Sequence, residues 1–281
     1  MKLKKILAAA AVAAAMTAMT ACGSASENIN VVTREEGSGT RGAFTELFEI
    51  VDADGNDAII DTAEVTNSTA VMLQTIAGDS NAIGYASMGA VDSSVKILSI
   101  DGAAGTIENI NNGSYSIARP FNIVTKTEGV SEVAQDFIDF IMSSNGQSII
   151  EEENYIKVSD GSAYTASGKS GKVSLSGSTS VGPVMEILAE EYMKLNPDVQ
   201  VEVQQTGSSA GITAAIEGVC DIGMSSRDLK DEEISQGLAA TTIATDGIAV
   251  IVNTENELSG LTSEQVKQIY LGEITDFSEV E

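Results

Sequence analysis

The chain has 281 residues, of which 43% are hydrophobic, so it can bury one large core or two moderate ones. Its formal net charge of −26 argues against nucleic acid or an anionic membrane surface as a partner, since both need clustered basic residues. The sequence contains no histidine, which argues against Ser-His-Asp catalysis, zinc sites and most acid–base chemistry near neutral pH. Its two cysteines are too few for a disulfide framework.

The first 22 residues have the layout of an export signal: a basic start, an apolar alanine-rich run and small residues before Cys22. The run from Ile6 to Met19 is too short to span a bilayer comfortably. Residues 19–22, Met-Thr-Ala-Cys, resemble the lipobox of bacterial lipoproteins. This resemblance implies a signal peptide over 1–21, a lipidated Cys22 and a tether over 22–30, placing the protein on the extracellular face of the cell membrane. An ordinary secretory signal with a stray cysteine is the alternative.

Strand-like and helix-like segments then alternate. Before residue 158 we expect strands at 29–33, 82–87 and 121–125, and helices at 41–51, 68–78 and 131–144. Residues 158–171 are rich in Gly, Ser and Thr without apolar periodicity, which predicts a flexible linker.

After the linker, a strand near 172–176 precedes a helix with Pro183 in its first turn. That helix has one apolar face, formed by Val181, Val184, Met185, Leu188, Tyr192 and Leu195. Further strands are expected at 199–205, 220–224 and 248–253, with helices after Gly207 and Thr262. The alternation predicts an α/β fold with mainly parallel sheets, and Cys220 is predicted to be a buried core thiol.

Small hydroxyl residues and glycines recur where a strand leads into a helix. They occur at 177–180, 207–211 and 37–40, and a fourth such turn, 67–69, opens another helix. Free N–H groups and the positive dipole end make a helix N-terminus an anion site, although helix capping alone also explains any single turn. Arg34 and Arg41 flank one turn, and none is followed by the Gly-Lys-Ser/Thr of a P-loop. The turns therefore indicate a site that holds an anion without transforming it.

Several segments closely resemble the periplasmic or lipoprotein phosphate-binding proteins of high-affinity ABC phosphate importers. They are "GSTSVGPVMEILAEEY", "QQTGSSAGITAAIEGVCDIGMSSRDLKDEE", "DGIAVIVN", "QIYLGEITDF", "REEGSGTRGAF" and "AIGYAS". The resemblance covers nearly all of residues 29–157 and 172–281. It implies a two-lobed venus-flytrap fold of the type II periplasmic binding proteins, with the anion held between the lobes.

The order of these motifs departs from that family, where "GSTSVGP" comes near the mature N-terminus and "REEGSGTRGAF" near the middle. The chain is therefore interpreted as a circular permutant, with Glu281 expected near Ile29 and a mobile linker; two fused fragments that pair between chains are the alternative. Mapped onto this order, one lobe comprises 31–117 with 246–281, and the other comprises 118–245. The crossings near 117–121 and 245–249 form the hinge.

The resemblance also carries over candidate ligand residues where motifs match. Thr179, Ser180 and Ser208 match anion contacts of one lobe, while Arg34, Ser38, Gly39 and Thr40 match contacts of the other. Glu36 is expected to orient Arg34. For Arg41 there are two alternatives: a salt bridge, either at the surface or between the lobes, or a contact with the ligand.

Ser226 puts phosphate selectivity in doubt, because some family members have an aspartate there that accepts the proton of phosphate. An obligate acceptor rejects fully ionised sulfate, whereas a hydroxyl can donate instead. Discrimination between phosphate and sulfate is then weaker, or it relies on another acceptor such as Asp246. Ser226 itself is retained as a candidate ligand residue.

The sequence thus predicts a lipid-anchored receptor that captures inorganic phosphate and delivers it to ABC permease subunits. It is expected to lack enzymatic activity, cofactors and metals, to contact the membrane through its anchor alone and to bind no nucleic acid. A receptor for sulfate, molybdate or a phosphate ester is the alternative, and a metal-dependent phosphatase is less favoured because the sequence has no compact Asp/Glu motif. Sequence alone does not separate transport from a signalling or adhesive role.

Overall fold

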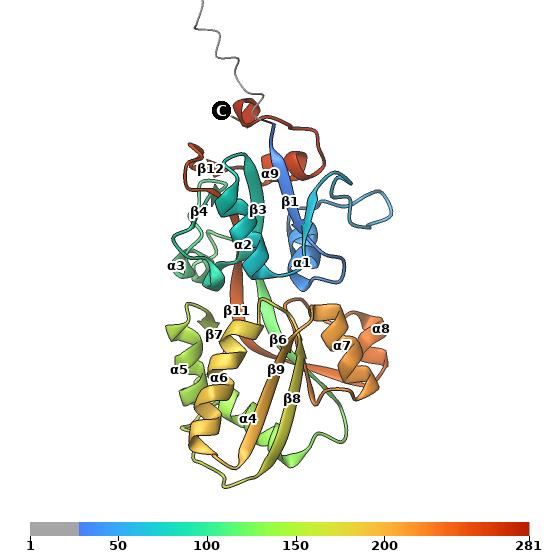
Figure 1. Cartoon of the computed structure of the whole chain (residues 1–281), viewed down its shortest axis with the longest axis vertical. Coiled ribbons are helices and arrows are strands. Elements are labelled where there is room, and N and C mark those ends of the chain that lie inside the picture. Colours follow the sequence, from blue (N-terminus) through green and yellow to red (C-terminus); the bar gives the residue numbers. More distant parts are fainter. Residues whose placement is uncertain (1–27, 281) are drawn as a thin grey trace, which may run out of the picture.

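The computed structural model describes residues 28–280 (Figure 1). The predicted signal peptide, Cys22, the tether up to residue 27 and Glu281 lie outside this range. Up to residue 126 the elements are β1 (Asn30–Arg34), α1 (Gly39–Leu47), β2 (Glu64–Thr66), α2 (Thr69–Gly78), β3 (Ala82–Ser87), η1 (Met88–Ala90), β4 (Val95–Ile97), β5 (Ser99–Ile100), α3 (Ile107–Asn111) and β6 (Ala118–Lys126).

The remaining elements repeat the alternation of strands and helices. They are α4 (Glu132–Met142), α5 (Ser144–Glu152), β7 (Ile156–Lys157), β8 (Gly171–Gly177), α6 (Gly182–Leu195), β9 (Val199–Gln205), α7 (Ser208–Glu217), β10 (Ile222–Ser225), α8 (Asp231–Ser235), β11 (Leu238–Asn253), β12 (Gly260–Leu261), α9 (Ser263–Tyr270) and η2 (Phe277–Val280). None of the helices within residues 28–280 combines the length and apolar character that a membrane crossing requires.

A continuous ladder of strands links the two halves of the molecule, in the order β2-β1-β3-β11-β6-β10-β8-β9. β1 pairs in parallel with β2 and β3, and β8 pairs in parallel with β9 and β10, as expected for an α/β fold. β11 is antiparallel to its neighbours and changes partner along its length. Its residues 238–247 pair with β6, and residues 248–252 pair with β3.

The buried core divides at this change of partner. One large cluster draws on residues between Phe121 and Ala244, and another on residues 31–117 and 248–280. Figure 1 shows the corresponding bodies one above the other, joined by β6 and β11. We infer that they are the two lobes, called here the first lobe (28–117 and 246–280) and the second lobe (118–245).

Helix boundaries follow from local chemistry. α1 begins at Gly39, two residues before the predicted start, because Ser38 caps it and accepts a hydrogen bond from Arg41 N. On α6 the predicted apolar face is buried up to Tyr192, whereas Leu195 in the last turn is 44% exposed. Cys220 is buried in the second lobe, as predicted.

Segment 158–171 contains no helix, and its only strand residue is Gly171, but it is not a free tether. The Gln147 carbonyl accepts hydrogen bonds from the backbone N–H groups of Val158 and Ser159. Further along, the Tyr164 ring packs edge-on against Phe140, and its hydroxyl donates to Asp136 at 2.7 Å. A sequence that looks featureless by periodicity is thus anchored by individual side chains.

The two ends of the described chain lie side by side in the first lobe. Asn28 forms an antiparallel bridge with Asp276, and Ile29 N donates to Thr275 O at 2.8 Å. This proximity is what a rearranged segment order requires, because a chain can be reopened only where its ends meet.

Asp136 should be the main anchor of the linker. One of its carboxylate oxygens accepts from Tyr164, Ser167 and Tyr192, and although burial alone would raise its pKa, these hydroxyl donors bring the pKa below its ordinary value. We expect Asp136→Ala to destabilise the fold by about 2 kcal/mol in urea unfolding at neutral pH, since it leaves partly buried hydroxyls without an acceptor. Because the depressed pKa stabilises the fold only above the unfolded-state value, the difference should shrink below about pH 4.

The matched control is Asp139→Ala, one turn further along the same helix, where the side chain is exposed. Equal stability of the two variants would contradict the anchoring role.

Candidate functional site

Four helices of the two lobes begin at the interface between the lobes. Figure 1 shows α1 and α2 at the lower edge of the first lobe, facing α6 and α7 of the second. Each follows a strand through a short turn rich in Ser, Thr and Gly, so each presents free backbone N–H groups and the positive end of its dipole. The strand-to-helix turns predicted from sequence therefore converge on one place.

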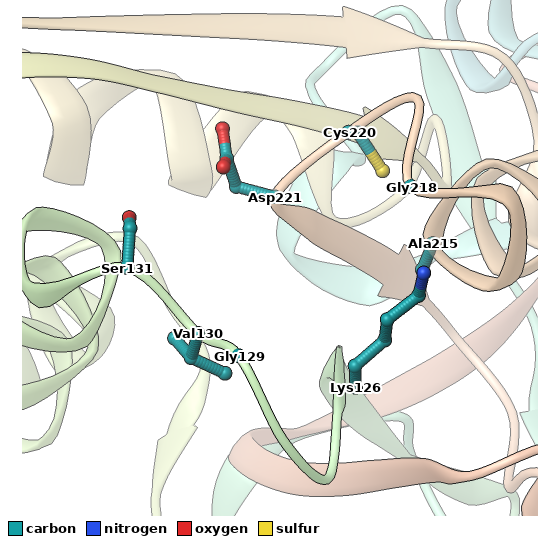
Figure 2. Close-up of a pocket in the computed structure, with 8 residues that line it drawn as sticks. All are labelled: Lys126, Gly129, Val130, Ser131, Ala215, Gly218, Cys220 and Asp221. Atoms are coloured by element: carbon teal, nitrogen blue, oxygen red, sulfur yellow. The ribbon is translucent and has the colours of Figure 1, made fainter.

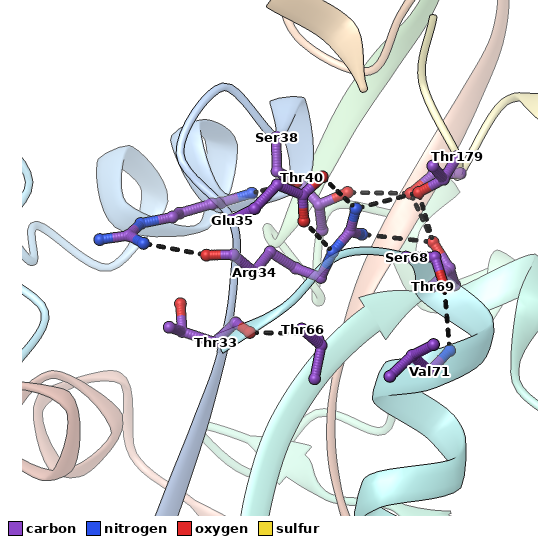
Figure 3. Close-up of polar contacts among 12 residues, drawn as sticks. Thr33, Arg34, Glu35, Ser38, Thr40, Thr66, Ser68, Thr69, Val71 and Thr179 are labelled. Carbon is purple, nitrogen blue, oxygen red and sulfur yellow. Dashed lines mark hydrogen bonds and ion pairs between the residues drawn. The ribbon is translucent and has the colours of Figure 1, made fainter. Parts of the chain in front are cut away.

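Arg34, the last residue of β1, is the buried cation of this interface and is only 2% exposed. Its Nη2 donates across the interface to Thr179 Oγ1 at 3.0 Å, and its Nη1 lies 3.4 Å from Thr69 Oγ1 (Figure 3). Glu35 holds the guanidinium through two hydrogen bonds, of 2.8 and 2.9 Å. The prediction that Glu36 orients Arg34 is wrong: Glu36 is exposed, and the adjacent Glu35 takes this role.

Hydroxyl groups from both lobes meet beside Arg34. Thr40 Oγ1 and Ser180 Oγ are 2.9 Å apart, and Thr69 Oγ1 lies within 3.3 Å of both Thr179 Oγ1 and Ser180 Oγ. All four side chains are at most 5% exposed. This cluster can surround a small tetrahedral anion with O–H donors, and the cationic Arg34 adds charge-assisted bonds.

A second hydroxyl cluster adjoins the first. Ser208, at the start of α7, and Ser226, just after β10, have their hydroxyl oxygens 3.3 Å apart. A Cβ atom added to Gly39 would come within 2.4 Å of Ser208 Oγ and 2.6 Å of Ser226 Oγ. Any side chain at this position would therefore displace these hydroxyls, so glycine suits the close approach of the N-terminus of α1 to the second lobe.

Seven of the eight residues predicted to bind the anion lie in these two clusters. Ser38 instead serves as the N-cap of α1, and Arg41 forms an ion pair with Asp57 within its own lobe while donating to Arg34 O at 2.9 Å. Burial alone would lower the pKa of Arg41, but its bond to Asp57 raises it overall. Sequence reasoning left out Thr69, although this residue follows a strand-to-helix turn that it had singled out.

Tyr85 of β3 holds the backbone of Arg34 in place. The phenol oxygen accepts from Arg34 N at 3.1 Å and lies 2.8 Å from Thr33 Oγ1. Complete burial raises the pKa of Tyr85 to about 12, so its hydroxyl remains protonated. Its ring stacks on Phe44, with centroids 3.9 Å apart, and this packing ties the end of β1 to the hydrophobic core.

An ion pair that sequence reasoning did not predict lies in the strands joining the lobes. Arg119 of β6 and Asp246 of β11 stand opposite each other in the ladder, with Nη2 and Oδ2 3.1 Å apart and both side chains at most 3% exposed. Ser87 donates to the other carboxylate oxygen, and Arg119 Nη1 lies 3.4 Å from Ser226 O. Asp246, considered above as an acceptor for the anion, is thus bound to Arg119 and Ser87.

Arg227, which follows Ser226, is also bound within the second lobe. Its guanidinium makes hydrogen bonds of 2.8 and 2.9 Å to the two carboxylate oxygens of Glu233. Burial alone would raise the pKa of Glu233, but Arg227 lowers it overall. This ion pair fixes the turn after β10, on which Ser226 stands.

A separate pocket of about 190 Å³ lies in the second lobe (Figure 2). Lys126 and Asp221 contribute its charged groups, and the thiol of Cys220 borders it. Burial raises the pKa of Cys220, which keeps it a thiol. The pocket is lined by residues of one lobe alone, and none of the predicted ligand residues is among them.

Comparison with known proteins identifies relatives along the whole chain. A family profile described as "PBP superfamily domain" matches residues 2–145 and 162–280. The phosphate-binding protein PstS 2 of Streptococcus agalactiae serotype V is 52% identical over 256 residues, covering 90% of this chain and 87% of that protein. The phosphate-binding protein PstS 2 of Streptococcus pneumoniae serotype 4 is 42% identical over 292 residues, covering both chains completely.

A solved structure agrees with these matches. The crystal structure of a phosphate ABC transporter phosphate-binding protein from Streptococcus pneumoniae TIGR4 superposes with a TM-score of 0.73 at 43% identity, covering 90% of this chain and 100% of that one. Because the match to the Streptococcus pneumoniae sequence runs from end to end, the order of motifs is the same in that relative. The segment order inferred as a permutation is therefore not peculiar to this chain.

The Arg119–Asp246 pair should leave a signature in the pH dependence of stability. Desolvation by burial raises the pKa of Asp246 to about 6 from its ordinary 3.8, although Arg119 opposes the shift. Between these two pKa values Asp246 is protonated in the folded state and ionised in the unfolded state. The free energy of unfolding therefore decreases as pH rises through this range.

In Asp246→Asn this cost is absent. We expect the free energy of unfolding of the wild type, minus that of the variant, to fall by about 3 kcal/mol between about pH 4 and about pH 7. Urea unfolding at several pH values measures it, with the exposed Asp61→Asn as control. A difference that is constant with pH would show that Asp246 does not titrate in this range.

Proposed function

Since the chain belongs to the PBP superfamily, and within it to the family of phosphate-binding proteins PstS, we propose that it captures inorganic phosphate between its lobes and delivers it to an ABC importer. The observation that carries this proposal is the convergence of Arg34 with hydroxyl groups of both lobes at the starts of four helices. Such a site binds a compact anion on all sides, and it can form only where the lobes meet.

The energetics of this arrangement suit reversible capture. Hydrogen bonds to a charged group contribute about 1.5–3 kcal/mol each, so a handful of them supports micromolar or tighter binding after the entropic costs of association. Arg34 supplies the fork-shaped donor that suits an oxyanion, and Glu35 holds that fork in place. An anion between the lobes joins them, and the closed shape is what a permease recognises.

Binding without turnover fits the chemistry of the cluster. It consists of hydroxyl groups and one guanidinium bound to a carboxylate, without a nucleophile paired to a general base among the described residues. Phosphatase assays with and without divalent metal test this assignment, since robust metal-dependent turnover would overturn it.

An exported, lipid-anchored location completes the proposal. Residues 1–21 provide the signal and Cys22 the modified residue, and a receptor for an importer works outside the cytoplasmic membrane. The anchor keeps the receptor near its permease, which raises the effective concentration of the loaded protein there.

Thr179→Val provides a direct test of the site. The substitution keeps the shape of the side chain but removes a hydroxyl that bonds to Arg34 across the interface. We expect phosphate affinity to fall about 10- to 100-fold, as the loss of one hydrogen bond to a charged group predicts. Isothermal titration calorimetry on protein freed of anion by unfolding and refolding gives the dissociation constants.

The control is Thr213→Val, an exposed threonine on α7 outside the clusters, which should bind as the wild type does. Wild-type affinity in Thr179→Val would remove this residue from the site. Failure of the folded wild type to bind phosphate would overturn the proposed function.

Cys22→Ser tests the anchor. We expect the variant to be exported but released from the membrane fraction, because a lipidated cysteine supplies the hydrophobic attachment. Immunoblotting of membrane and soluble extracellular fractions measures the distribution, with Cys220→Ser as the matched control that should stay membrane-bound. Membrane retention of Cys22→Ser protein from which residues 1–21 have been cleaved would contradict lipidation at this residue.

A further inference from the structure

The two lobes also touch beside the anion site, through residues other than the candidate ligand residues. Ser209, in the first turn of α7, donates its backbone N–H to Gly37 O at 3.0 Å, across the interface between the lobes. A Cβ atom added to Gly37, which has a φ of +82°, would lie 3.2 Å from Ser209 Cβ, so the two turns are in direct contact. Figure 1 shows α1 above α7 and α8 on this side of the molecule.

Arg227 of the second lobe extends this contact along α1. A Cβ atom added to Gly42 of that helix would lie 3.7 Å from Arg227 Cδ, an ordinary van der Waals distance. The guanidinium is held in place, because it donates to Ser209 Oγ at 3.3 Å and to both carboxylate oxygens of Glu233. Gly37 and Gly42 of the first lobe, with Ser209 and Arg227 of the second, are called here the closure contact.

The closure contact joins the lobes through the protein alone. Rotation of the lobes away from each other separates Ser209 from Gly37 and Arg227 from α1, while Arg227 keeps its bonds to Ser209 and Glu233 within the second lobe. The contact therefore stabilises the closed form whether or not an anion is bound. Gly37 is exposed, so water replaces the hydrogen bond on opening and the net stabilisation is modest.

We propose that the closure contact sets the balance between the open and closed forms, with Arg227 as a positioning residue that slows release of the anion. This inference rests on the proposed function and concerns how that site opens and closes. The apparent affinity scales with the population of the form that holds the anion on all sides, and the anion leaves only after the lobes open. A stronger closure contact should thus appear mainly as slower dissociation.

Gly42 allows a test from outside the anion site, because it is exposed and an added Cβ atom fits against Arg227 without a clash. In Gly42→Glu a carboxylate faces the guanidinium across the interface, whereas Gly42→Lys sets two like charges there. We expect phosphate to dissociate about three- to tenfold more slowly from Gly42→Glu than from Gly42→Lys, the range that exposed charge pairs support. Exchange of radiolabelled phosphate against an excess of unlabelled phosphate measures these rates.

Two other effects of these charges predict the reverse order. Acting directly on phosphate, the added carboxylate would repel the anion and the added ammonium would attract it, chiefly through the association rate. Within α1, Glu46 lies four residues beyond position 42 and favours Lys over Glu there. The sign of the change in dissociation rate therefore separates closure of the lobes from attraction of the ligand and from stabilisation of the helix.

Small-angle X-ray scattering of the anion-free protein tests closure without a ligand. Gly42→Glu should have a smaller radius of gyration than Gly42→Lys, and the two should converge at saturating phosphate. Combining each variant with Arg227→Gln should abolish the difference in dissociation rate, since the charge that position 42 faces is then absent. Gln74→Glu and Gln74→Lys, at an exposed position of α2, are the matched control and should release phosphate at the same rate.

The results separate this inference from the proposed function. If both Gly42 variants bind phosphate and release it at equal rates, or if Gly42→Glu releases it faster, the role of the closure contact is overturned and the proposed function stands. If the folded wild type does not bind phosphate, the proposed function is overturned, and scattering by the anion-free Gly42 variants still decides whether the contact holds the lobes together. Neither decision requires Arg227→Gln to fold.

Discussion

Strand β11 is the constraint on which the rest of the structure depends, because it belongs to both lobes. Its 16 residues pair first with β6 and then with β3, and the change of partner at Gly247 and Ile248 is where the core divides. This register sets Asp246 opposite Arg119 and within reach of Ser87, so one buried ion pair touches the first lobe and both connecting strands. Removing one partner of a buried pair is strongly destabilising, which makes the strand crossing hard to rearrange.

From this crossing the geometry of the site follows. Arg119 also donates to the carbonyl of Ser226, so a hydrogen bond links the ion pair to the candidate anion site. On the other side, Tyr85 of β3, next to β11 in the sheet, holds the backbone of Arg34. The cation and the hydroxyls are therefore positioned by neighbouring strands of one ladder, and a change in the angle between lobes moves them relative to each other.

The sequence predicted most strands and helices, because apolar periodicity and helix caps are local signals. It also predicted the gathering of hydroxyl turns, since strand-to-helix turns of an α/β fold meet at the same edge. It did not distinguish Glu35 from Glu36, because both lie beyond the end of β1, where the chain enters a turn and periodicity no longer indicates where side chains point. Arg119 carried no local signal at all: its partner is 127 residues away and is chosen by strand pairing.

The same limit explains the linker. Periodicity describes segments that bury a regular face, whereas segment 158–171 is held by scattered bonds to Gln147 and Asp136. Under the proposed function, an acidic protein captures an anion through local groups. Solvent screens charges beyond about 8 Å, so the distant acidic surface matters little at the site. The groups that would face the proposed anion are Arg34 and the hydroxyls beside it, and these local groups, not the net charge of −26, account for its capture.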